Sequence, residues 1–184
     1  ESYVVGSHEF YMGYAIKNQK LLCIDAGHFH PTETIADKLG SALMFVPEIL
    51  LHVSRGVRWD SDHVILQSDD VLQVAQELVG ASLLDRTYIG LDFFDATISR
   101  TAAWVIGVRN MQKALLRALL MPMDKLRGIE ASLDYTTRLM ITEEIKDLPF
   151  GIVWNELCHR NGRPTGLSLI GELDSYQAKV AGQR

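Results

Sequence analysis

The sequence has little of several features that define common protein classes, and each shortage excludes a class. Only two of its 184 residues are cysteines, Cys23 and Cys158, which are too few for a disulfide scaffold and fit a reducing cytoplasm. No apolar run reaches the roughly 18 to 20 residues that a membrane helix needs, and no signal peptide is visible. With 18 basic against 23 acidic residues, the net charge of −5 disfavours nucleic-acid binding.

Several catalytic motifs are also absent. The chain has no Walker loop, no G-x-G-x-x-G fingerprint and no G-x-S-x-G nucleophile elbow. What is present is an ordinary globular composition, 47% hydrophobic and 22% charged, which excludes disorder as the main state. The length predicts one domain, or part of a larger one.

Hydrophobic periodicity predicts an alternating order of strands and helices. Short apolar runs bounded by turn residues predict buried strands at 20–26, 49–53 and 88–92. Helices are expected from Pro31-Thr32-Glu33, from Asp69-Asp70 and over 104–119, with one more over 124–147 and a helical tail at 150–182 that breaks at 162–166. This order favours an α/β fold with a parallel sheet wrapped by helices, whose strands are buried on both faces.

Several other residues that stand out in the sequence are expected to have structural roles only. Cys23 lies inside the first strand and is expected to be a packing residue. The stripe from Trp104 to Leu119 is expected to face the core, and the charged residues of 124–147 to form a solvated face. His8 and Glu9 are interpreted as a loop pair.

Asp and His residues gather at the downstream ends of the three predicted strands. The first strand ends in Asp25, followed by His28 and His30. The second contains His52 and leads to Asp60, Asp62 and His63, and the third ends in Asp92, followed by Asp95. Ligands bind outside the carboxyl ends of strands in parallel α/β folds, so the sequence predicts a polar site at this rim.

Asp60 and Asp62 are candidate metal ligands because residues two apart in an extended segment point the same way. Two adjacent carboxylates repel unless a cation lies between them. Mixed carboxylate and imidazole ligation suits Mn²⁺, Zn²⁺, Co²⁺ or Mg²⁺ without choosing among them. The alternative is that both are solvated loop acids, because a short D-S-D motif is weakly specific.

The remaining candidates have structural alternatives too. His28 and His30 share the two-residue spacing, but each could be a hydrogen-bonded structural histidine. His52 could be a buried neutral imidazole that bonds to the backbone. Asp92 ends an apolar run, where an unpaired carboxylate would be costly to bury, so it needs a metal, a base or a hydrogen-bond partner.

Longer strings go beyond these short motifs. They are ESYVVGSHEFYMGY at 1–14, DAGHFHPTE at 25–33, LLHVSRGVRWDSDHV at 50–64, IGLDFFD at 89–95 and AAWVIGVRNMQKALLRALL at 102–120. With these strings the chain resembles the bacterial L-rhamnose isomerases. The resemblance covers essentially the whole chain and is looser beyond about residue 150.

The resemblance implies a (β/α)₈ TIM barrel that interconverts L-rhamnose and L-rhamnulose with two divalent metals, typically Mn²⁺. It implies a catalytic metal held by His28, Asp60 and Asp62. It also implies a structural metal held by Asp25, His52, Asp92 and a glutamate upstream of this chain. Asp92 and His28 are the residues it points to as catalytic.

The activity implied is a metal-assisted hydride shift between C2 and C1, in which metals polarise the sugar oxygens and a metal-bound water moves the hydroxyl proton. The resemblance further implies a cytoplasmic homotetramer whose partner is a small sugar, with neither nucleic acid nor membrane involved.

A complete barrel takes about 250 residues, more than this chain has. We therefore expect it to be the C-terminal portion of the enzyme, with barrel strands and helices over 1–123 and a helical C-terminal extension over 124–184. The missing N-terminal half of the barrel would then be a required partner. The alternatives are another divalent-metal barrel enzyme, such as a sugar epimerase or a phosphodiester hydrolase, and a non-catalytic metal-binding or assembly fragment.

Overall fold

A computed structural model describes residues 6–30, 32–54 and 63–183. Its contacts divide the chain into two compact units, Glu1–Ala118 and Leu119–Arg184. Within the described residues, no helix is both long and apolar enough to cross a membrane.

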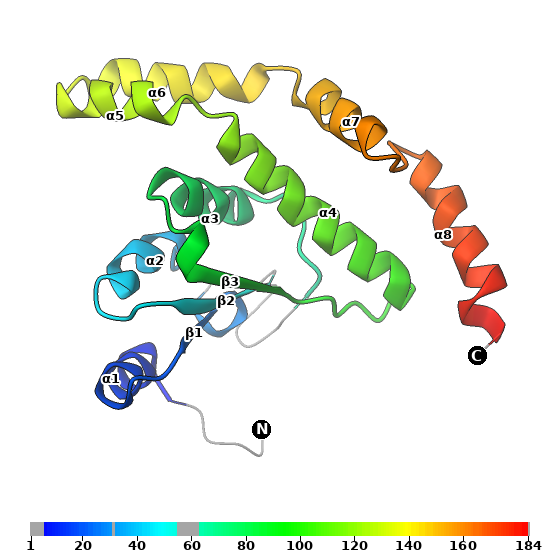
Figure 1. The fold of residues 1–184 in the computed structure, drawn as a ribbon, viewed down its shortest axis with the longest axis horizontal. Coiled ribbons are helices and arrows are strands. Elements are labelled where there is room, and N and C mark those ends of the chain that lie inside the picture. The colour runs from blue at the N-terminus through cyan, green and yellow to red at the C-terminus, as the bar shows by residue number, and fades with distance from the viewer. Residues whose placement is uncertain (1–5, 31, 55–62, 184) are drawn as a thin grey trace. The chain divides into compact units, whose positions relative to one another are not determined.

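The first unit is a mixed α/β structure, as the sequence predicts. It runs α1 (His8–Asn18), β1 (Leu22–Asp25), a 3-10 turn η1 (Ala26–His28), α2 (Ala36–Leu43), β2 (Ile49–Val53), α3 (Asp69–Gly80), a 3-10 turn η2 (Leu84–Arg86), β3 (Thr87–Leu91) and α4 (Arg100–Leu119). The three strands form a parallel sheet in the order β1-β2-β3 (Figure 1). Asp25 lies opposite His52, and His52 opposite Gly90.

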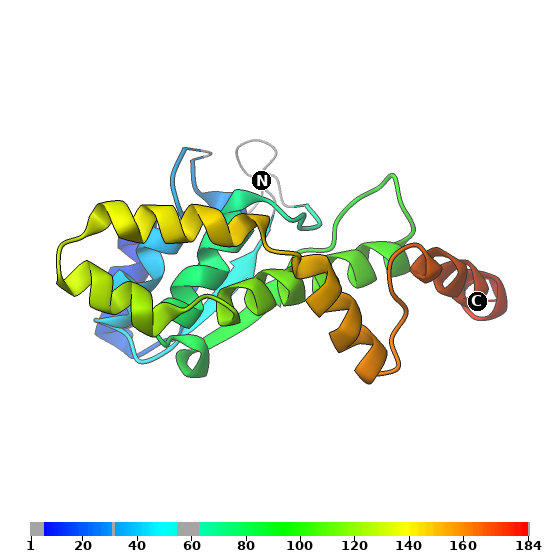
Figure 2. The same ribbon diagram turned by 90° about the horizontal axis from the view of Figure 1, so that it is seen from above.

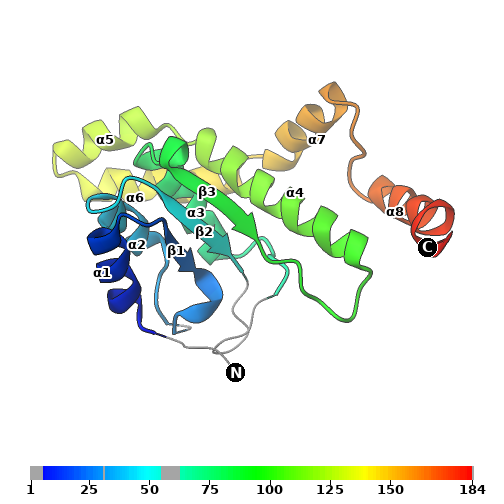
Figure 3. The same cartoon turned by 60° about the horizontal axis from the view of Figure 1, so that its bottom comes forward.

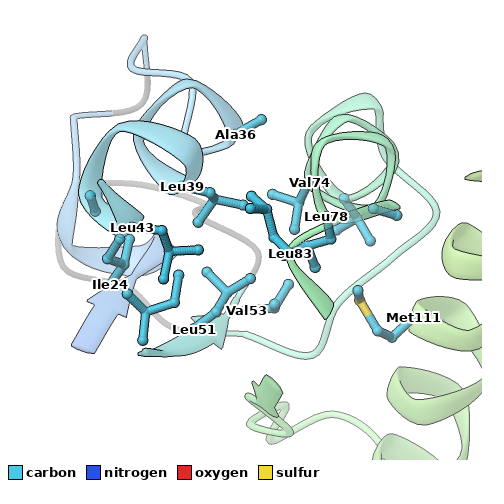
Figure 4. Close-up of a cluster of buried hydrophobic side chains, with 14 of the residues drawn as sticks. Ile24, Ala36, Leu39, Leu43, Leu51, Val53, Val74, Leu78, Leu83 and Met111 are labelled. Carbon is cyan, nitrogen blue, oxygen red and sulfur yellow. The ribbon is translucent and has the colours of Figure 1, made fainter. Parts of the chain in front are cut away.

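One face of this sheet carries the hydrophobic core. Ile24, Ile49 and Leu51 are fully buried. Figure 4 shows Ile24 and Leu51 pointing toward α2 and α3, which contribute Leu39 and Leu78. Because alternate strand residues point to opposite faces, burial of this set leaves the next residue of each strand on the other face. The core therefore fixes which side of the sheet holds Asp25 and His52.

The expectation that the strands are buried on both faces is wrong for this chain. On the second face Cys23 is exposed, Leu50 is half-buried and Tyr88 is 55% exposed. β1 and β2 thus alternate between buried and accessible residues, since the packed helices α2 and α3 lie on one side of the sheet. Cys23 is consequently not a packing residue of the core.

Two helices near the N-terminus differ from the sequence-based expectation. Residues His8 and Glu9, interpreted as a loop pair, lie in the first turn of α1, which Ser7 caps by accepting a hydrogen bond from the Phe10 backbone N–H. The second helix begins at Ala36, after the expected start. Pro31 of that start signal lies outside the described residues.

The prediction that the stripe from Trp104 to Leu119 of α4 faces the core is correct for only part of the stripe. Trp104, Val108 and Leu119 are exposed, while Met111 is buried. The buried positions of α4 are mostly small: Ala103, Gly107, Ala114 and Ala118. Of the predicted stripe, Met111 and Leu115 pack against the core, and the small side chains let the helix backbone approach its neighbours closely.

Asn110 of α4 makes a buried side-chain hydrogen bond. Its Nδ2 donates to the Ile65 carbonyl at 3.0 Å. We expect Asn110→Ala to lower the free energy of unfolding by about 1–2 kcal/mol, because it leaves that acceptor unpaired. Chemical denaturation should detect the loss, and Gln112→Ala, an exposed amide on the same helix, should cost less than about 0.5 kcal/mol. Equal effects would contradict the assignment.

The second unit is helical. It contains α5 (Met123–Ala131), α6 (Tyr135–Glu144), a 3-10 turn η3 (Ile145–Asp147), α7 (Phe150–Arg160), α8 (Ser168–Lys179) and a 3-10 turn η4 (Ala181–Gln183). The single helix expected over 124–147 is two helices that lie side by side (Figure 2). Leu133 adopts a positive φ of 61° between them, and Asp134 caps α6. The break expected at 162–166 is confirmed between α7 and α8.

Candidate metal centre at the strand ends

The parallel sheet brings the predicted polar residues to one edge. All three strands point the same way, so their carboxyl ends lie together (Figure 3). Asp25 is the last residue of β1, and His52 is next to last in β2. Asp92 directly follows β3, and its backbone N–H donates to the Val53 carbonyl at 2.9 Å. This last bond extends the β2–β3 pairing by one residue and places Asp92 beside the other two.

The side chains of these residues converge. His52 Nδ1 lies 2.7 Å from Asp25 Oδ2, and His52 Nε2 lies 3.9 Å from Asp92 Oδ2. The imidazole of His52 therefore stands between two carboxylates from neighbouring strands. His28 adds a second imidazole, with its Nε2 3.8 Å from Asp25 Oδ2. His52 is bonded to a carboxylate, which is a partner that its structural alternative did not include.

Asp25 is the centre of the group. Its Oδ1 accepts a hydrogen bond from the Gly27 N–H at 2.9 Å, which caps the 3-10 turn η1 and holds His28 above the end of β1. Partial burial raises the pKa of the Asp25 carboxyl. The hydrogen bonds from His52 and Gly27, with the nearby His28, lower it by more, so the pKa lies below its ordinary value. Asp25 is thus a carboxylate at neutral pH.

Other predicted residues have different surroundings. His30 Nδ1 lies 2.7 Å from Thr32 Oγ1, and its backbone N–H donates to Glu33. Asp95 accepts hydrogen bonds from the backbone and side chain of Thr97. Asp60 and Asp62 lie outside the described residues.

The described residues supply suitable donors without forming a finished ligand cage. Two carboxylates and two imidazoles are the mixed donor set that Mn²⁺, Zn²⁺, Co²⁺ and Mg²⁺ accept. Across residues 6–30, 32–54 and 63–183, however, no group of three or more His, Cys, Asp or Glu side chains is positioned to hold a metal ion. The short Asp25–His52 hydrogen bond occupies an oxygen and a nitrogen that ligation would need. These residue types suit a divalent metal ion, and a complete coordination shell needs further ligands.

Sequence reasoning missed the residues that support this edge. Ser54, directly after β2, is buried, and its Oγ accepts a hydrogen bond from the His63 N–H at 3.1 Å. Phe94 donates its N–H to Asp92 Oδ1 at 2.6 Å. A buried hydroxyl after a strand and a D-x-F turn are weak signals in sequence, because such local hydrogen bonds are common throughout proteins.

His8 gives this region a pH dependence. Burial first, and Lys38 second, lower the pKa of His8, outweighing Glu9 and Glu33. The unfolded chain therefore binds the proton more readily than the folded chain, and stability falls as the pH drops through the ordinary histidine range near 6.5. We expect His8→Gln to reduce the loss of stability between pH 7.5 and pH 5.5, measured by urea unfolding. An unchanged pH slope would show that His8 does not contribute.

The fold and site define the class: a parallel α/β protein with acidic and imidazole side chains at the carboxyl ends of its strands. The family model for L-rhamnose isomerase (RhaA) matches residues 1–184, so the chain belongs to the L-rhamnose isomerase family. It is 58% identical over 184 residues to the L-rhamnose isomerases of Salmonella paratyphi B and Salmonella enteritidis PT4. These matches cover 100% of this chain and 44% of each relative, so the chain spans less than half of their length.

Proposed function

We propose that this chain forms part of an enzyme that interconverts L-rhamnose and L-rhamnulose. The observation that carries the proposal is the convergence of Asp25, His28, His52 and Asp92 at one sheet edge, in a chain that matches the L-rhamnose isomerase family throughout. The names of the Salmonella relatives support the same activity. The open face of the sheet leaves these side chains accessible to a small sugar.

We assign two metal sites to this edge. Asp25, His52 and Asp92 would hold one divalent ion, together with a ligand from outside the described residues, and His28 with Asp60 and Asp62 would hold the other. Mn²⁺ is the proposed ion, with Zn²⁺, Co²⁺ or Mg²⁺ as substitutes of the same ligand preference.

The reaction moves one hydrogen with its electron pair from C2 to C1, and one proton from the C2 hydroxyl to the oxygen on C1. A bound divalent metal supplies Lewis-acid polarisation of the sugar oxygens. We assign Asp92 and His28 as the catalytic residues of this edge, and both side chains are at least partly accessible. Asp25 fixes the orientation of the His52 ring at this edge through their 2.7 Å hydrogen bond.

We further propose that the sheet is one arc of a (β/α)₈ barrel. Both β1 and β3 are edge strands in the described sheet, and parallel sheets are normally covered on both faces. The rest of the barrel would pair with these edges and cover the face that holds Cys23 and Tyr88. A cytoplasmic homotetramer is the proposed assembly, and the helical second unit its C-terminal extension.

The test is ketose formation from L-rhamnose with and without Mn²⁺. It is made on the 184-residue chain and on a chimera in which this chain replaces the matching 44% of the Salmonella enteritidis relative. Manganese-dependent turnover by the chimera is the expected result. A folded chimera that binds Mn²⁺ but does not convert L-rhamnose would overturn the proposal and favour a non-catalytic metal-binding role or another sugar substrate.

A further inference from the structure

The orientation of Asp92 depends on a turn that follows β3. Phe94 donates its backbone N–H to Asp92 Oδ1 at 2.6 Å, which leaves Oδ2 as the oxygen nearest His52 Nε2, at 3.9 Å. Such a turn, in which an aspartate binds the backbone two residues later, fixes the carboxylate only while the following backbone stays in place. What holds residues 93 and 94 therefore decides where Asp92 points.

Phe93 is held by α4 at a position that has no side chain. A Cβ atom added at Gly107 would lie 3.2 Å from both Phe93 Cδ1 and Cε1, and 3.4 Å from Val64 Cγ2. Carbon atoms pack best at about 3.5–4.0 Å, so the ring already occupies the space that a methyl group would need. The ring of Phe93 also meets Trp104, one turn earlier in α4, edge to face at 6.4 Å.

Phe94 is fixed on the opposite side of the turn. Its carbonyl accepts a hydrogen bond from the Val64 N–H at 2.9 Å, and its ring meets the His63 imidazole edge-on at 5.7 Å. The backbone of residues 93 and 94 is therefore held between α4 and the segment that begins at His63. Displacing either contact moves the donor that orients Asp92.

We propose that Gly107 and Phe93 are positioning residues for the metal site, with a glycine needed at residue 107 because the Phe93 ring lies against the bare backbone of α4. The proposal rests on the proposed function only for the identity of the ion. The steric argument is local. A methyl group at residue 107 requires the Phe93 ring to move by a few tenths of an ångström, and that movement shifts the 92–94 turn that orients the Asp92 carboxylate.

The opposing effect of helix propensity makes Gly107→Ala informative. In a helix interior alanine is favoured over glycine, so on propensity alone the variant should be more stable. Gly128 in α5 and Gly151 in α7 are matched controls, since an added Cβ at either would have nothing within 4 Å. Gly128→Ala and Gly151→Ala should therefore show the propensity gain alone.

Two measurements test the proposal, one with metal and one without. Titration calorimetry with Mn²⁺ on the chimera gives the dissociation constant, and Gly107→Ala should raise it roughly tenfold, within the range for outer-shell partners of metal ligands. The Phe94 amide proton chemical shift of the metal-free 184-residue chain reports the 2.6 Å bond directly, and Gly107→Ala should move it upfield. The two control variants should leave both measurements unchanged.

Phe93→Ala removes the ring itself. It should also raise the Mn²⁺ dissociation constant and move the Phe94 amide shift upfield, in this case without a steric clash. Adding Phe93→Leu to Gly107→Ala should restore part of the Mn²⁺ affinity, because the smaller side chain makes room for the methyl group. An unchanged Phe94 amide shift in both Gly107→Ala and Phe93→Ala overturns the proposal, whatever their stability. An inactive but Mn²⁺-binding chimera would instead overturn the proposed function, while the Phe94 shift still decides this inference.

Discussion

Replacing Asp25 by asparagine should reduce Mn²⁺-dependent conversion of L-rhamnose by the chimera more than about a hundredfold, because outer-shell changes alone commonly cost 10–100-fold. Asp25 Oδ2 lies within 3.8 Å of His28 Nε2 and 2.7 Å of His52 Nδ1. The neutral amide removes the negative charge to which both imidazoles are directed. It keeps an oxygen that can still accept from the Gly27 N–H, so the fold should persist.

Steady-state kinetics and calorimetric Mn²⁺ titration are the measurements for Asp25→Asn. Asp37→Asn is the control, since Asp37 is an exposed acid in the first turn of α2 that is not among the assigned ligands. It should retain activity and Mn²⁺ affinity close to those of the unsubstituted chimera. Near-normal turnover by Asp25→Asn would remove Asp25 from the metal site, and with it the assignment of His52 as its partner.

The position of the candidate site could be predicted from the sequence because it depends on few assumptions. Asp25, His52 and Asp92 each lie at or near the end of an apolar run, and parallel strands place such ends together. No knowledge of loop structure is needed for that step. The pairing of His52 Nδ1 with Asp25 could not be predicted, since it depends on strand register to a single residue.

The sequence-based predictions that proved wrong have a common physical cause. Burial of a strand or helix face depends on which neighbours are present, and periodicity within a segment does not contain that information. Cys23 and Trp104 lie in apolar segments and were expected inside, yet both are exposed in the described structure. The helix α1 was missed for a related reason, since its aromatic residues Phe10 and Tyr14 are also exposed and mark no buried stripe.

These exposed residues bear on how the first unit completes its structure. The accessible sheet face holds Asp25 and His52 near one end and the apolar side chains of Leu50 and Tyr88 farther back. A closed barrel would bury the apolar part and leave the polar end open, which is where barrel enzymes place their active sites. The same face that departs from the expected burial is thus the face that the proposed function requires.

At the other end of the sheet, Arg86 joins three parts of the chain. Its Nη2 donates to the carbonyls of Leu43 at 2.7 Å and Val46 at 2.9 Å, and its Nε donates to the Pro47 carbonyl at 2.7 Å. Leu43 is the last residue of α2, so the guanidinium also lies where the helix dipole favours a positive charge. The arginine ties the start of β3 to the α2–β2 connection.

Arg86→Ala should lower the free energy of unfolding by about 2–3 kcal/mol, because three carbonyls lose a charged donor and two of them belong to buried residues. Urea unfolding followed by circular dichroism measures the loss. Arg86→Lys keeps the charge but replaces the planar fork with a single ammonium group, so it should recover less than half of the difference. Full recovery by lysine would mean that charge alone acts here. A loss below about 0.5 kcal/mol in the alanine variant, the range of ordinary surface substitutions, would mean that water replaces the arginine without cost.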